Sequence, residues 1–160
     1  MGGLVAYEMA QQLQRAGQEV GLLALLDTHT PSVLGQISDL DDEELLRLFK
    51  SDMDALYGPD SLDSNQLDRL FQVFRANAQA MLRYEPQRYE GRMTLFRAGD
   101  RLYELSLDPI EEWRNLAGDG VEVHVVPGNH YTMLKEPAVL VLADWLKVCL
   151  NLGHQKAQKV

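Results

Sequence analysis

The sequence is poor in cysteine and in positive charge, and each shortage excludes a class of protein. Cys149 is the one cysteine among 160 residues, so no internal disulfide can form, and we expect a reducing, cytoplasmic setting. Lys and Arg number 15 against 24 Asp and Glu, for a formal net charge of −9. Nucleic acids and anionic membrane surfaces need a basic face, so neither is expected as a partner. No apolar run approaches the roughly 20 residues of a membrane span.

The apolar residues that are present alternate between helical and strand patterns. Helical spacing predicts helices over 3–16, from the Asp108 cap onward and over 138–149. Short apolar runs predict buried strands at 20–26, 93–98 and 121–126. Alternating helices and strands predict an α/β fold, with parallel strands flanked by helices.

Residues 32–90 interrupt this alternation and read as a helical insertion. A stripe of apolar residues at helical spacing marks its longer helix: Leu67, Leu70, Phe71, Phe74, Ala78, Met81 and Leu82. Asp63 and Gln66 have the spacing of a capping box at the start of that helix. We predict helices that pack over the strand ends without joining the sheet.

Three polar residues lie just beyond predicted strands: Asp27, Asp100 and His130. Reactive groups of parallel α/β sheets gather at the carboxyl ends of the strands. His130 follows a Pro-Gly-Asn turn and is a candidate general base, although a surface histidine of a turn would look the same. Asp27 or Asp100 is either the acid that orients this histidine or a cap for the next turn.

The remaining histidines and the nucleophile complete the set of candidates. His29 in a loop and His154 in the tail are weaker bases, and His124, out of phase with three valines of its strand, is structural. No serine lies on a tight turn after a strand, and Cys149 is on the buried face of the last helix. The chain instead begins with Met-Gly-Gly and a helix, the pattern found directly after the serine of a Gly-x-Ser-x-Gly elbow. In that reading, the small residues Gly2 and Gly3 let the helix pack tightly on the strand.

Two segments resemble the thioesterase domains that end nonribosomal peptide and polyketide synthetases. MGGLVAYEMAQQLQRAGQEVGLLALLD is similar to the segment after the active serine, and VEVHVVPGNHYTMLKEPAVLVLADWL to the segment with the active histidine. The resemblance covers residues 1–31 and 92–150. The residues between correspond to the variable lid of that family, with similarity only in helical character.

The resemblance implies the C-terminal part of an α/β-hydrolase fold, a partial thioesterase domain over residues 1–160 with a lid at about 32–90. It implies release of an acyl or peptidyl chain from phosphopantetheine on a carrier protein, by hydrolysis or macrocyclisation, with no cofactor bound directly. Asp27 takes the family's acid position, Asp100 that of many other α/β-hydrolases, and His130 the base position. Since the family's serine would precede Met1, we expect this N-terminally truncated chain to be inactive alone.

Two other functions are compatible with the same residues. One is a non-catalytic remnant that binds a carrier protein or a partner chain. The other is a hydrolase of the same fold that acts on oxygen esters.

Overall fold

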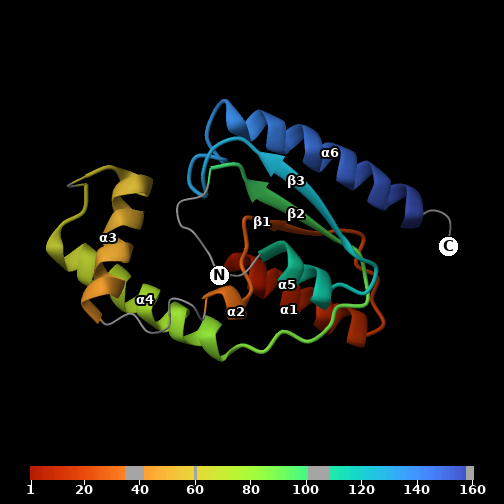
Figure 1. Ribbon diagram of the computed structural model, residues 1–160, viewed down its shortest axis with the longest axis horizontal. Helices are drawn as coiled ribbons and strands as arrows, with labels where there is room; N and C mark the ends of the chain where they lie inside the picture. The colour runs from red at the N-terminus through yellow and green to blue at the C-terminus, as the bar shows by residue number, and fades with distance from the viewer. Residues whose placement is uncertain (35–41, 60, 101–108, 158–160) are drawn as a thin grey trace. The chain divides into compact units, whose positions relative to one another are not determined.

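The computed structural model describes residues 1–34, 42–59, 61–100 and 109–157 (Figure 1). The chain divides into two compact units, one formed by Met1–Thr30 with Pro86–Val160 and the other by Pro31–Glu85. The Asp108 cap predicted from the sequence lies outside the described residues.

The first unit contains a parallel sheet of β1 (Leu23–Leu26), β2 (Met93–Ala98) and β3 (Val121–Val126), in that order. Leu26 lies beside Phe96, and Ala98 beside Val126, so the carboxyl ends of the strands share one edge. The predicted parallel sheet is confirmed. The predicted start of the first strand at residue 20 is wrong, because β2 begins at Met93, the partner of Leu23, and leaves residues 20–22 without a partner among the described strands.

Helices cover both faces of this sheet (Figure 1): α1 (Gly2–Arg15) and α5 (Pro109–Leu116) lie on one face and α6 (Ala138–Ala157) on the other. Gly17 ends α1 as predicted, with a left-handed φ of 71° that lets Gln18 N–H donate to Leu13 O at 2.9 Å. A buried cluster joins α6 to the sheet: Phe96, Ala98, Val126, Met133, Ala138, Leu142 and Cys149.

His124 belongs to the face of the sheet that α6 covers. Its ring stacks between Phe96 and Trp145, with ring centroids 5.4 Å and 4.2 Å away. Its Nε2 lies 3.1 Å from Glu122 Oε1. These contacts agree with the structural role predicted from its position on the strand.

The second unit is helical in its described part: α2 (Pro31–Leu34), α3 (Asp42–Tyr57) and α4 (Ser64–Arg83). The predicted capping box starts α4, since Asp63 Oδ1 accepts from Gln66 N–H at 2.9 Å and Gln66 Oε1 accepts from Asp63 N–H at 3.0 Å. Phe49 of α3 is buried against two phenylalanines of α4. The helical character of the insertion is confirmed, and its role as a lid stays a prediction.

The stretch from residue 86 to about residue 90, the predicted end of the insertion, lies in the first unit. The second unit ends at Glu85, and Tyr89 makes an isolated parallel bridge with Ala117 in the first unit. Tyr89 is buried, and its backbone N–H donates to Leu116 O at 2.9 Å. Tyr89 is therefore part of the first unit, which contains the sheet.

Candidate active site

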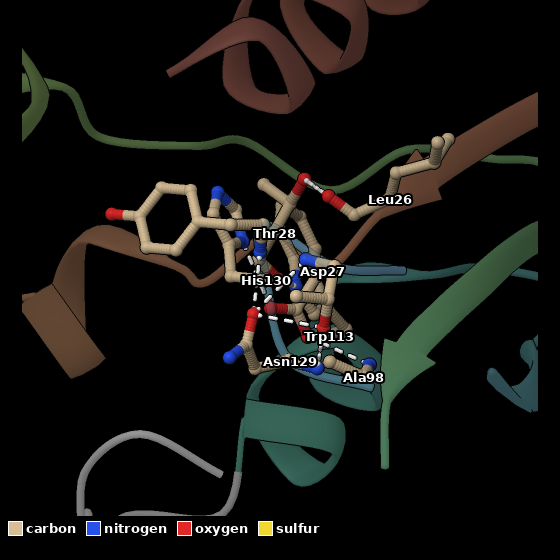
Figure 2. A network of polar contacts seen from close by, with 9 residues as sticks. Leu26, Asp27, Thr28, Ala98, Trp113, Asn129 and His130 are labelled. Atoms are coloured by element: carbon tan, nitrogen blue, oxygen red, sulfur yellow. Dashed lines mark hydrogen bonds and ion pairs between the residues drawn. The ribbon is translucent and has the colours of Figure 1, made fainter. Parts of the chain in front are cut away.

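Asp27 lies directly after β1, where the chain turns away from the sheet (Figure 2). Its backbone N–H donates to Phe96 O at 2.7 Å, which keeps the residue attached to β2. Its φ is +43°, a left-handed value that is uncommon outside glycine, although Asp and Asn adopt it more often than other residues. The turn directs the carboxylate along the carboxyl edge of the sheet.

The Asp27 carboxylate has a partner for each oxygen. Oδ1 accepts from Ala98 N–H at 2.9 Å, and Oδ2 lies 2.8 Å from His130 Nδ1 (Figure 2). The side chain is only 11% exposed. Both contacts fix the carboxylate between the second and third strand ends. The predicted approach of Asp27 and His130 to hydrogen-bonding distance is confirmed.

Two opposing effects set the pKa of Asp27. Desolvation by burial acts to raise the pKa, but the hydrogen bonds from His130 and Ala98 N–H and the charges of His130 and His29 outweigh it. The pKa of Asp27 therefore lies below its ordinary value of 3.8, and the group is a carboxylate at neutral pH. The charge of His29, a weaker candidate base by sequence, contributes to this lowering of the Asp27 pKa.

His130 lies on a turn that its neighbours hold. Asn129 Oδ1 accepts from the N–H groups of Tyr131 and Thr132, each at 3.0 Å, and Asn129 N–H donates to Thr132 Oγ1 at 2.8 Å. Gly128 has φ of +89°, and a Cβ there would lie 2.5 Å from Thr132 Oγ1. The turn therefore requires glycine at this position, and the hydrogen bonds of the Asn129 and Thr132 side chains hold the backbone on both sides of His130.

The charge state of Asp27 determines which nitrogen of His130 carries the proton. A carboxylate has no hydrogen to donate, so Nδ1 must be the donor across the 2.8 Å contact. In the neutral ring, Nε2 then keeps its lone pair. The His130 side chain is 51% exposed, so part of the ring is open to solvent. The pair can therefore act as a base and its orienting acid.

Asp100, the alternative acid, does not form this pair: among the described residues, the carboxylate on the His130 ring is that of Asp27. Asp100 is exposed, and its backbone N–H donates to Gly128 O at 2.9 Å. The His154 side chain lies outside the described residues. Within the described part of the chain, no serine or cysteine is seen to bond to His130, and Cys149 lies instead 4.0 Å from His124 Nε2.

The start of α1 lies against the residue that follows Asp27. A Cβ at Gly3 would come within 2.0 Å of Thr28 Oγ1 and 2.7 Å of Thr28 Cβ, whereas one at Gly2 would meet nothing within 4 Å. The predicted tight packing therefore applies to Gly3, and for Gly2 it stays a prediction. This contact brings the first residues of α1 to the same edge of the sheet as the acid and base.

Sequence reasoning missed three residues around the pair: Thr28, Trp113 and Asn129. The Trp113 Nε1–H donates to Thr28 O at 2.7 Å, and the two residues are 85 positions apart in the sequence. A local sequence pattern cannot predict such a contact. Asn129 had a usable signal, because an Asn followed three residues later by Thr has the spacing of a side-chain turn.

The fold and the pair define a class of protein. A parallel sheet covered by helices on both faces, with an acid beyond the end of β1 and a histidine beyond the end of β3, is the arrangement of α/β-hydrolases. The thioesterase domain model matches residues 1–145, and the chain belongs to that family. Within the described part, no helix is long and apolar enough to cross a membrane.

Relatives among known proteins are large synthetases. The chain is 29% identical over 160 residues to malpinin synthetase of Mortierella alpina, covering 96% of this chain and 2% of that protein. It is 25% identical over 172 residues to the probable non-canonical nonribosomal peptide synthetase CymA of Salinispora arenicola, covering 91% of this chain and 2% of that protein. The chain thus spans a small fraction of these relatives.

Solved structures give the same family. The RedJ thioesterase of the prodiginine pathway in Streptomyces coelicolor has a TM-score of 0.71 and 26% identity, with 93% of this chain and 60% of that chain covered. The NocB thioesterase domain of the nocardicin cluster has a TM-score of 0.64 and 28% identity, with 94% and 61% covered.

Proposed function

We propose that this chain carries the acid Asp27 and the base His130 of a thioesterase domain that releases an acyl or peptidyl chain from a carrier protein. The substrate is a thioester on the carrier's phosphopantetheine, the domain binds no cofactor itself, and it works in the cytoplasm. The observation that carries the proposal is the 2.8 Å contact between Asp27 Oδ2 and His130 Nδ1, at the strand edge where this fold places its chemistry.

The geometry supports nucleophilic catalysis. His130 Nε2 takes the proton of a serine hydroxyl as its oxygen attacks the thioester carbonyl, and the ionised Asp27 stabilises the imidazolium that forms. The tetrahedral intermediate collapses, the carbon–sulfur bond breaks, and the imidazolium returns its proton to the phosphopantetheine thiol. Water, or a hydroxyl or amine of the bound chain, then loses a proton to His130 and attacks the acyl-enzyme. The second tetrahedral intermediate collapses, the bond between the acyl carbon and the serine oxygen breaks, and the imidazolium returns its proton to the serine.

The nucleophile in this proposal is a serine directly before Met1 in a longer protein. The support is the packing of Gly3 on Thr28, which brings the start of α1 to the edge of the sheet that holds Asp27. Met1 is the N-cap of α1, so the residue before it would lie at a strand-to-helix turn. The backbone N–H of Met1 would then help to stabilise the oxyanion.

The test begins with the reading frame upstream of Met1 and then assays the protein that it encodes. We expect an in-frame Gly-x-Ser, turnover of acyl-pantetheine thioesters, and loss of at least about 10³-fold in kcat in His130→Ala. The 160-residue chain without the upstream residues should give only background. A frame without that serine, or turnover insensitive to His130→Ala, would overturn the proposal.

The same assay separates the two other functions. Matched oxygen and thiol esters of one acyl group are compared, and a preference for the oxygen ester would favour an ester hydrolase. Binding of a carrier protein without turnover of either ester would favour a non-catalytic remnant.

A further inference from the structure

The turn that presents Asp27 is held by contacts from several elements. A residue in the left-handed region persists only where its surroundings fix it. Asp27 is fixed by Phe96 O and Ala98 N–H of β2, and the next residue, Thr28, is fixed by its own hydroxyl, which donates to Leu26 O at 3.1 Å. These contacts come from the sheet or from the turn itself. A further one comes from a helix.

That further contact is made by Trp113 of α5. Its Nε1–H donates to Thr28 O at 2.7 Å (Figure 2), and the residue is fully buried. Its ring lies 5.1 Å from that of Tyr7 in α1, and the Tyr7 hydroxyl donates to Gln87 O at 2.7 Å. The indole is thus held by packing, and its N–H has one orientation relative to the turn.

We propose that Trp113 is a positioning residue, whose indole N–H fixes the Thr28–His29 peptide, one residue beyond Asp27, and so holds the turn that aims the Asp27 carboxylate at His130. This inference rests on the proposed function for its effect on turnover. The hydrogen bond of the Trp113 indole goes to Thr28 and not to the acid or the base. It acts through Thr28: a free Thr28 carbonyl would let the Thr28–His29 peptide rotate, and the loosened turn would no longer hold the Asp27 carboxylate in line with Nδ1.

The test removes the N–H while keeping the ring shape. The protein with its upstream residues is prepared with Trp113→Phe and, separately, with 3-benzothienylalanine at position 113, which replaces the N–H by sulfur at nearly constant shape. Trp145→Phe is the matched control, because Trp145 is the other tryptophan, is 40% exposed and stacks on His124 away from the turn. Both kinetics and the solvent exchange of the His130 Nδ1 proton, followed by NMR, are measured.

We expect both replacements at position 113 to lower kcat about 3- to 10-fold with KM unchanged, the size of one lost hydrogen bond. The Nδ1 proton should exchange faster in both, and Trp145→Phe should match the wild type. If Trp113→Phe fails to fold, the benzothienyl variant decides.

Two results would overturn the inference: a benzothienyl variant with wild-type kcat and proton exchange, or a loss of kcat with unchanged exchange. If the wild type shows no turnover but the proton still exchanges faster in both variants at position 113, the positioning role stands and the proposed function fails.

Discussion

The contact between α1 and Thr28 makes a sharp prediction about two neighbouring glycines. In Gly3→Ala the new methyl would lie 2.0 Å from Thr28 Oγ1 and 2.7 Å from Thr28 Cβ. Rotation about χ1 of Thr28 moves the oxygen but leaves Cβ in place, so the helix or the turn must shift. Overpacking of this kind costs about 1–3 kcal/mol. In Gly2→Ala the methyl meets nothing within 4 Å, and alanine in a helix gains up to about 1 kcal/mol over glycine.

The same substitution at adjacent positions therefore has opposite signs. The difference in unfolding free energy between Gly2→Ala and Gly3→Ala should be about 1–4 kcal/mol. For a chain of this size that separates the melting temperatures by about 2–16 °C. Urea unfolding followed by tryptophan fluorescence measures it directly, because buried Trp113 is bonded to Thr28.

Equal stability of the two variants would refute the close packing of α1 on the turn. A loss in Gly3→Ala that is also seen in Gly2→Ala would instead indicate a general sensitivity of the first helical turn. Gly3→Ala should further lower turnover in the longer protein, because Thr28 adjoins Asp27.

Three further predictions concern the site and the exposed faces. Asp27→Asn should lower kcat about 10³–10⁴-fold. The pKa of Asp27 in the folded state is below 3.8, so the ionised carboxylate should stabilise the fold above pH 3.8. This stabilisation should be lost as the pH falls through the folded-state pKa. A stability difference from Asp27→Asn that stays constant below 3.8 would contradict this. Thr132→Val, which removes the hydroxyl that bonds Asn129, should lower kcat with little change in melting temperature; an unchanged kcat would show that the turn holds without it. The 160-residue chain should self-associate through exposed Val5 and Met9 of α1 and through the side of β1 that has no partner among the described strands. Lysines at positions 5 and 9 should therefore lower its apparent mass in size-exclusion chromatography, and a monodisperse wild-type monomer would count against this prediction.

Local sequence patterns predicted most helices and strands correctly. They failed where contacts between distant residues set the ends of an element. The strands at 93–98 and 121–126 and the Asp63 capping box match the structure, because each depends on neighbouring residues. The first strand starts three residues later than predicted, since a strand begins where its partner begins.

The choice between Asp27 and Asp100 had no local answer. Both follow a strand, and the residues alone allow either to orient His130 or to cap a turn. The pairing depends on the left-handed backbone of Asp27 and on Ala98 N–H, a contact across 71 residues of sequence. The family resemblance favoured Asp27, and the geometry agrees.

Thr28 explains why packing and chemistry are coupled at this edge of the sheet. Its side chain limits the approach of α1 at Gly3, and its carbonyl accepts a hydrogen bond from Trp113 of α5. Its hydroxyl donates to Leu26 O at the end of β1. The positions of the start of α1 and of Asp27 therefore both depend on buried Thr28. If a serine precedes α1, a shift of Thr28 displaces this nucleophile and Asp27 together. The distance between the nucleophile and His130 then changes, because the helix moves the serine and the acid moves the base. Substitutions remote from His130 can then alter turnover without contacting any reacting group.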